Sequence, residues 1–159
     1  MENFQDFYKR QKDKLFSYLI RITGDYHLSM DIMQESFLRC LEKYKNKPMN
    51  NSLLYTIARN VMIDYSRKDK RKREFEQHSI AQQINQENDL YIKQEYRQVI
   101  KAMESLEKDE REILAMVLTE NLKYREIASI IGIKENNVKV KVHRARMRLR
   151  EILQYGELS

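Results

Sequence analysis

Residues 124–153 read YREIASIIGIKENNVKVKVHRARMRLREIL, and this stretch holds two apolar helix faces separated by one glycine. Before Gly132, the face spans residues 127–131 at helical spacing; after it, a second face contains Val138, Val142, Ala145 and Leu149. Gly132 supplies the backbone freedom for a sharp turn, and the small Ala128 lets the two helices approach closely. The pattern predicts a helix-turn-helix near the C-terminus of the chain.

The polar face of the second predicted helix is basic and rich in amides. It carries Asn136, Asn137, Lys139, Lys141, His143, Arg144 and Arg146. Arg, Lys and Asn side chains address base edges in the major groove, while other cations hold phosphates. A solvated basic helix is the alternative, but the turn chemistry favours DNA; for His143 a DNA contact and an ordinary packing or surface role both remain open.

Apolar stripes upstream of this motif predict further helices. A first helix ends at Gly24 and Asp25, and a second covers residues 28–44 with Cys40 in its core. Ser52 is a plausible N-cap for a third, and Asp109 for a later one with Glu112 as its capping-box partner. The same pattern assigns a core face to the third helix and an end to the helix that follows Asp109. The third helix buries Leu54, Ile57, Ala58, Val61 and Tyr65, and Asn121 suits a left-handed position at the end of the helix that follows Asp109.

The polar face of the second predicted helix has two interpretations. It carries Asp31, Gln34, Glu35, Leu38, Arg39 and Glu42 at steps of three and four. Solvation is the usual explanation for such a face, and the exposed Leu38 is the one feature that favours a contact surface instead.

Composition favours an all-α chain, because its 159 residues include 34% charged residues but only three Gly and one Pro. Two small helical domains are expected, residues 1–73 and 93–159, joined by a flexible acidic linker over 74–92. Lys and Arg exceed Asp and Glu by 16 to 9 in residues 1–73 and by 13 to 10 in 97–159, whereas residues 74–96 carry one against five. Two basic blocks of this kind usually meet a polyanion, most commonly nucleic acid.

Other classes of protein are poorly supported. The three histidines are dispersed, and no metal-ligand spacing, phosphate loop or nucleophile motif accompanies them, so we expect no catalytic residue, metal or cofactor. No aromatic sheet motif or glycine-rich loop supports an RNA-binding module. One cysteine, no signal-peptide pattern and no apolar run of membrane length predict a cytoplasmic protein without membrane insertion.

Three stretches in order resemble the bacterial RNA polymerase sigma factors of the sigma-70 family, extracytoplasmic-function (ECF) group. They are FQDFYKRQKDKLFSYLIRITGDYHLSMDIMQESFLRCLEKY from residue 4, LLYTIARNVMIDYSRKDKRK from residue 53, and SLEKDEREILAMVLTENLKYREIASIIGIKENNVKVKVHRARMRLREIL from residue 105. The resemblance spans nearly the whole chain apart from the linker. A stand-alone transcription regulator would explain the third stretch but would leave the first without a role.

The resemblance implies partners for these surfaces. The DIMQESFLRCLE helix would dock on a coiled coil of the largest subunit of core RNA polymerase through Asp31, Gln34, Glu35 and Leu38, and the family also contacts the polymerase flap region. The next helix would hold and open the minus-ten promoter element. Its contacts to the unpaired strand would be Tyr55, Thr56, Arg59 and Asn60, with Arg67, Lys68, Lys70 and Arg71 on phosphates.

In the same family the last helix enters the major groove of the minus-thirty-five element. This implies DNA contacts from Val140 in addition to the seven polar residues named above, and family members are commonly held inactive by an anti-sigma protein. Four positions depart from the family pattern. Leu53 replaces a common tryptophan, Asn136 and Asn137 replace small residues, and Val140 replaces a usual serine, so promoter preference cannot be copied from relatives.

Overall fold

The computed structural model describes residues 3–44, 47–73 and 94–155, which form helices without any strand, so the predicted all-α class is confirmed. The predicted linker at 74–92 lies outside the described residues. The helices are α1 (Phe4–Thr23), α2 (Tyr26–Lys43), α3 (Asn51–Arg73), α5 (Gln94–Glu104), α6 (Lys108–Val117), α7 (Tyr124–Ile131) and α8 (Glu135–Tyr155).

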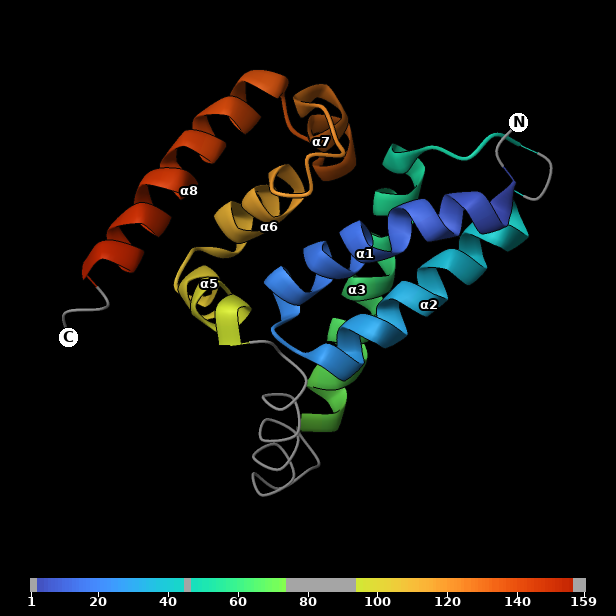
Figure 1. Ribbon diagram of the computed structural model, residues 1–159, viewed down its shortest axis with the longest axis horizontal. Coiled ribbons are helices and arrows are strands. Elements are labelled where there is room, and N and C mark those ends of the chain that lie inside the picture. The colour runs from blue at the N-terminus through green and yellow to red at the C-terminus, as the bar shows by residue number, and fades with distance from the viewer. Residues whose placement is uncertain (1–2, 45–46, 74–93, 156–159) are drawn as a thin grey trace.

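Helices α1, α2 and α3 form one bundle, in which α2 packs against both α1 and α3 (Figure 1). Gly24 adopts φ 64° and ends α1, as predicted, and the Asp25 side chain then accepts a hydrogen bond from the Leu28 amide at 3.1 Å and caps α2. The core of this bundle includes edge-to-face packing of Phe37 with Phe7 and Tyr8, at ring-centroid distances of 6.3 and 4.8 Å. Cys40 is also buried in the core, as expected.

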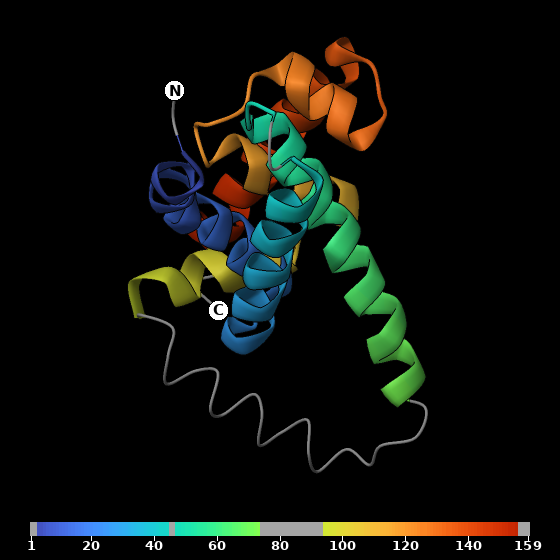
Figure 2. The same cartoon turned by 90° about the vertical axis from the view of Figure 1, so that its right-hand side faces the viewer.

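The start of α3 differs from the predicted one. Asn50, not Ser52, accepts the capping hydrogen bond, from the Leu53 amide at 2.8 Å, and the helix begins at Asn51. The side chains predicted for its core face are buried, with Tyr65 only partly so. The C-terminal half of α3 extends away from the rest of the molecule (Figure 2).

Helices α6, α7 and α8 confirm the predicted helix-turn-helix. Gly132 has φ 85°, and the amides of Gly132 and Ile133 both donate to the Ala128 carbonyl at 2.8 and 3.0 Å, which closes the end of α7. Val138, Val142 and Ala145 of α8 are buried.

Two expectations around α6 were wrong. The left-handed residue after this helix is Glu120, at φ 55°, rather than Asn121. Glu107 occupies the N-cap without a side-chain hydrogen bond, and Asp109 falls in the first turn of α6.

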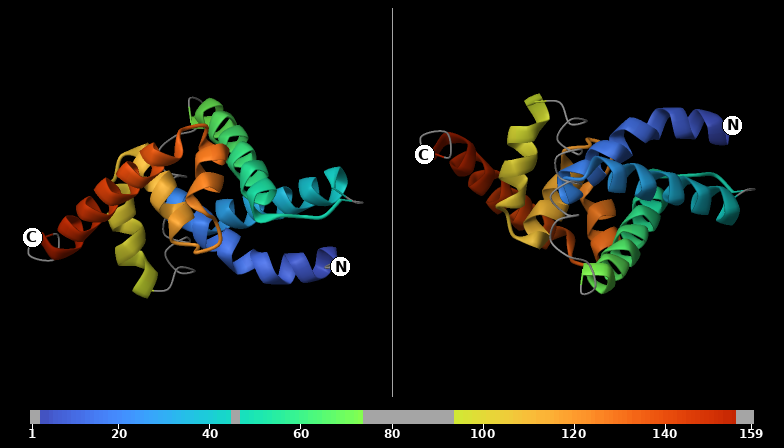
Figure 3. Two further views of the ribbon diagram at one scale, coloured as in Figure 1. Left: turned by 90° about the horizontal axis from the view of Figure 1, so that it is seen from above. Right: turned by 90° about the horizontal axis from the view of Figure 1, so that it is seen from below.

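The two bundles also pack on each other. Helix α1 lies against α5 and α6, and α3 contacts α7, so that the buried residues of both bundles belong to one continuous cluster (Figure 3). The two predicted domains therefore share an interface that the sequence did not indicate.

Candidate partner and nucleic-acid interfaces

The outward face of α2 presents the four residues predicted to contact a partner. Asp31, Gln34 and Leu38 are exposed, and Glu35 is partly exposed. Leu38 keeps 55% of its surface accessible, which makes it the most exposed large hydrophobic side chain among the described residues. An exposed leucine between acidic and amide groups is a small amphipathic surface, and nothing in the described part of the chain covers it.

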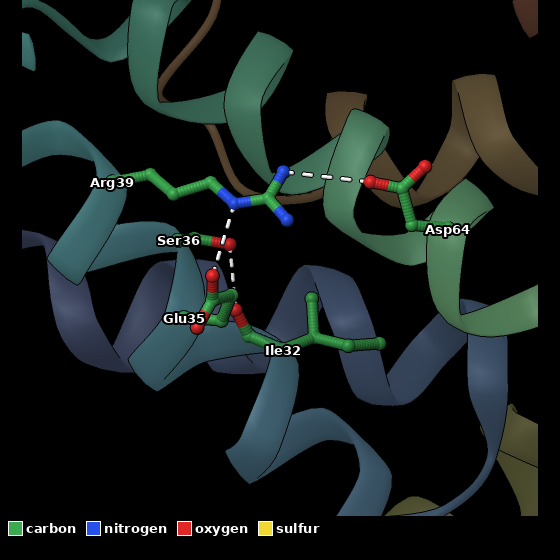
Figure 4. Close-up of polar contacts among 5 residues, drawn as sticks. All are labelled: Ile32, Glu35, Ser36, Arg39 and Asp64. Carbon is green, nitrogen blue, oxygen red and sulfur yellow. Dashed lines mark hydrogen bonds and ion pairs between the residues drawn. The ribbon is translucent and has the colours of Figure 1, made fainter.

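Arg39 fixes one edge of this surface (Figure 4). Its Nε donates to Glu35 at 3.0 Å and its Nη1 to Asp64 of α3 at 3.5 Å, while the Ser36 hydroxyl donates to the Ile32 carbonyl at 2.6 Å. The hydrogen bond to Glu35 is the main cause of the raised pKa of Arg39. Glu35 is thus held in position by its own helix, whereas Asp31, Gln34 and Leu38 remain available to a partner.

The residues of α3 predicted to meet an unpaired strand do not share one environment. Asn60, Arg67 and Lys68 are exposed, and the Thr56 hydroxyl donates to the Ser52 carbonyl at 2.8 Å. The side chains of Lys70 and Arg71 lie outside the described residues.

Tyr55 is the residue whose placement differs most from the prediction. Its side chain is fully buried, and its ring packs edge-to-face on Tyr18 of α1 with the centroids 5.1 Å apart. Burial raises the pKa of the Tyr55 phenol, and Asn121 and Thr119 of the second bundle are among its polar neighbours. In this arrangement the Tyr55 side chain is not accessible to DNA, because the second bundle helps to cover its ring.

Arg59 and Glu112 form an ion pair between the two bundles. The Arg59 Nε donates to the Glu112 carboxylate, and the two side chains are 27% and 12% exposed. This hydrogen bond is the first cause of the raised pKa of Arg59, and it outweighs the opposing effect of burial. Arg59 is therefore occupied by Glu112, which the sequence had placed in a capping box.

An amide network also links the two bundles. The Asn121 side chain donates to Gln11 of α1, and the Asn51 side chain of α3 donates to the Asn121 side chain at 2.8 Å. Gln11 is fully buried and its Nε2 lacks a hydrogen-bond partner among the described residues. The interface between the bundles consequently includes polar contacts beside its apolar core, and amides widely separated in sequence gave no periodic signal by which they could be predicted.

Helix α8 carries the predicted DNA face. The residues on it that are exposed to solvent are Asn136, Asn137, Lys139, Val140, His143, Arg144 and Arg146. Lys141 is the exception, since its ammonium group lies 3.4 Å from Asp109 of α6 and its side chain is half-buried. The predicted residues apart from Lys141 therefore form one outward surface on the second helix of the motif.

The described residues contain neither a candidate metal centre nor a candidate membrane span. No group of three His, Cys, Asp or Glu residues suitable for a metal ion occurs in the ranges that the structure describes. Within those same ranges, no helix is both long enough and apolar enough to cross a bilayer.

Comparison with known proteins matches both bundles. Residues 7–72 match the model of sigma-70 region 2, and residues 96–149 match that of sigma-70 region 4. RNA polymerase sigma factor SigV of Bacillus subtilis is 30% identical over 158 residues, which cover 98% of this chain and 89% of SigV. The chain belongs to the sigma-70 family.

Within the sigma-70 family, this sigma factor is similar to members of the ECF group. ECF RNA polymerase sigma factor SigM of Bacillus subtilis is 29% identical over 156 residues, covering 95% of both chains. The solved complex of sigma factor RpoE with anti-sigma factor NepR from Bartonella quintana contains a similar fold, with a TM-score of 0.67, 24% identity, and coverage of 94% of this chain and 98% of that one. CnrH, solved with the cytosolic domain of CnrY, gives a TM-score of 0.66 at 17% identity, covering 96% and 88%.

Membership establishes the general activity. The chain is a sigma factor that binds core RNA polymerase and directs promoter-specific initiation of transcription. Its relatives are initiation factors and not enzymes.

Proposed function

We propose that residues 1–73 bind core polymerase and the minus-ten element, and that residues 93–159 bind the minus-thirty-five element. The observation that carries this division is that one chain presents two unlike surfaces on separate bundles. The first is the acidic face of α2 around the exposed Leu38, and the second is the basic face of α8. A protein that only bound DNA would have no use for the first surface.

The face of α2 suits a helical partner with basic side chains. Asp31 supplies negative charge, and Leu38 supplies an apolar anchor that a partner can desolvate. These features support docking on the coiled coil of the largest polymerase subunit. An apolar groove between α6 and α8, lined by Leu114, Leu118, Leu149 and Leu153, is the corresponding candidate for the flap region.

Strand opening falls to α3. Asn60 is exposed for hydrogen bonding to a flipped base, and Arg67 and Lys68 lie farther along the same helix for phosphates. Arg59 can join them only after it leaves Glu112, so engagement of the minus-ten element requires the two bundles to separate locally. Binding energy for the open strand drives this change, and no catalytic group is needed.

Duplex recognition falls to α8. Residues in its first turns reach base edges, because the second helix of such a motif enters the major groove by its N-terminal end. The exposed Asn136, Lys139 and Arg144 have the chemistry for base or phosphate contacts there.

Regulation by an anti-sigma protein is part of the same proposal. RpoE and CnrH, two proteins of similar fold, were each solved with a bound partner, NepR and the cytosolic domain of CnrY respectively. A partner of this type that covers the face of α2 or α8 would block polymerase or DNA. We place the protein in the cytoplasm, where polymerase acts, and assign it no enzymatic activity or cofactor.

The test is a binding assay between this sigma factor and core polymerase. Leu38→Ala should weaken binding roughly 5- to 30-fold. Truncation reduces the apolar surface buried in the contact, which lowers the binding free energy by about 1–2 kcal/mol. Met147→Ala is the matched control, since Met147 is 51% exposed on α8 and has no predicted contact with the coiled coil. Equal affinities for Leu38→Ala and the wild type would exclude the face of α2 as the docking surface.

A further inference from the structure

The outward face of α8 has apolar side chains at its centre. Val140 is 48% exposed and Met147 is 51% exposed, and both belong to the small set of large hydrophobic residues that are exposed in the described part of the chain. At 3.6 residues per turn, Val140 points almost opposite to the buried Val138, Val142 and Ala145. Val140 therefore stands on the crest of the helix, where a duplex in contact with this face comes nearest.

The cations of α8 lie beside this crest or behind it. Lys139 and Arg144 flank Val140 on its two sides by helical geometry, and both are exposed. Lys141 and Arg148 instead turn toward α6, where Lys141 is 3.4 Å from Asp109 and Arg148 is 3.4 Å from Glu110. Burial of Val138, Val142 and Ala145 fixes the rotation of α8 about its axis, so the crest is not free to roll away from a bound duplex, and the two ion pairs agree with this orientation.

Among the four standard bases, a valine at the crest has one apolar group to read in the major groove. It has no hydrogen-bonding group, and the apolar group in the major groove is the C5 methyl of thymine. An adenine or cytosine amino group facing Val140 would lose water without gaining a partner. Contact with thymine therefore discriminates among the bases, whereas flanking cations can reach phosphates whatever the sequence.

Resting on the proposed function, we propose that Val140 is a specificity-determining residue that reads a thymine methyl in the minus-thirty-five element. Asn136 lies one turn earlier on the same crest, roughly 6 Å along the axis, which is about two base-pair steps. Its amide suits the N6 and N7 atoms of adenine. The expected element contains a T·A pair under Val140 and an adenine within about two steps of it.

The experiment uses holoenzyme reconstituted from core polymerase and the full chain. Run-off transcription of genomic DNA followed by sequencing first identifies a promoter. Each thymine of its upstream element is then replaced by deoxyuridine, which removes only the methyl group. At the position under Val140, the replacement should lower initiation by the wild type about fourfold when holoenzyme is limiting. This is the effect expected from the loss of one buried methyl-sized group.

The variant Val140→Ala assigns the effect to its residue. It retains a good helix former at an exposed site, so folding should be preserved. In this variant the deoxyuridine effect should shrink below about 1.5-fold, since little apolar surface remains to contact the methyl. Met147→Ala, seven residues farther along and equally exposed, should keep the fourfold effect.

The outcomes separate the two proposals. Initiation that is insensitive to deoxyuridine at every upstream thymine would overturn the role of Val140 and leave the proposed function intact. The same conclusion holds if Val140→Ala keeps the full wild-type sensitivity. Absence of initiation from any promoter would overturn the proposed function itself, and the role of Val140 with it.

Discussion

The ion pair between Arg59 and Glu112 should hold the two bundles together measurably. Arg59 belongs to α3 and Glu112 to α6, so their hydrogen bond links the first bundle to the second. We consider Arg59→Ala, Glu112→Ala and the double variant. Each single change removes one charge and leaves the other at the interface.

The two single variants should differ in cost. Glu112 is only 12% exposed, so loss of Arg59 leaves a nearly buried carboxylate without its countercharge. Fully buried pairs lose about 3–5 kcal/mol in this situation and exposed pairs about 0–1 kcal/mol, which places Arg59→Ala at roughly 2–4 kcal/mol. Arg59 is 27% exposed and its long stem can turn the guanidinium to water, so Glu112→Ala should cost only about 1–2 kcal/mol.

A double-mutant cycle in urea provides the measurement. The free energy of unfolding of the four proteins should give a coupling energy of about 1–2 kcal/mol. A second measurement uses the distance between two spin labels. Ser66 of α3 and Ser129 of α7 are both exposed, and each is replaced by cysteine for labelling in a Cys40→Ala background. The distance distribution between the labels should broaden when either charge is removed, which distinguishes separation of the bundles from local unfolding.

The pair between Lys141 and Asp109 is the internal control. It joins α8 to α6 within one bundle, and Asp109 is highly exposed, so its coupling should stay below about 1 kcal/mol. The reasoning is refuted if the Arg59 and Glu112 cycle gives no larger coupling than this control. It is equally refuted if Glu112→Ala costs more than Arg59→Ala.

Two further predictions concern other parts of the molecule. Burial raises the pKa of the Cys40 thiol from 9.0 to about 11, so its stabilising contribution is complete below pH 9 and is lost as pH rises toward 11. The stability difference between the wild type and Cys40→Ala should therefore shrink by roughly 2–3 kcal/mol over that interval in urea titrations, and a constant difference would contradict the assignment. Arg144→Ala should cost about 1–3 kcal/mol at the cognate minus-thirty-five element if Arg144 reads a base, whereas a uniform loss on all sequences would make it a phosphate contact. Lys141→Ala should weaken DNA binding less, because that side chain already faces Asp109.

Periodicity predicted the helices well, because each is amphipathic and buries a single stripe. The stripe of Val138, Val142 and Ala145 identified α8, and Gly132 identified the turn, since few other residues adopt its left-handed backbone. Helix ends were predicted less well. Asn50 caps α3 in place of Ser52 because several neighbouring polar residues can serve as the N-cap, and the sequence does not rank them.

The candidate sites divide in the same way. Exposure of Leu38, Asn60 and Arg144 follows from the face that each occupies on its own helix. The environment of Tyr55 does not, because its polar neighbours Asn121 and Thr119 lie more than sixty positions away in the sequence. Lys141 likewise shares the basic sequence pattern of α8 and is turned to α6 only by the packing of the two helices.

The sequence by itself determined an all-α chain with a helix-turn-helix, two basic blocks and the resemblance that names the family, since each depends on residues close together in the chain. Only the tertiary structure decided that the two bundles pack on each other and that Arg59 is occupied by Glu112. It also turned Lys141 away from the other basic residues of α8 and toward Asp109 of α6. The physical reason is that ion pairs and burial between helices depend on distances in space, which helical periodicity does not encode.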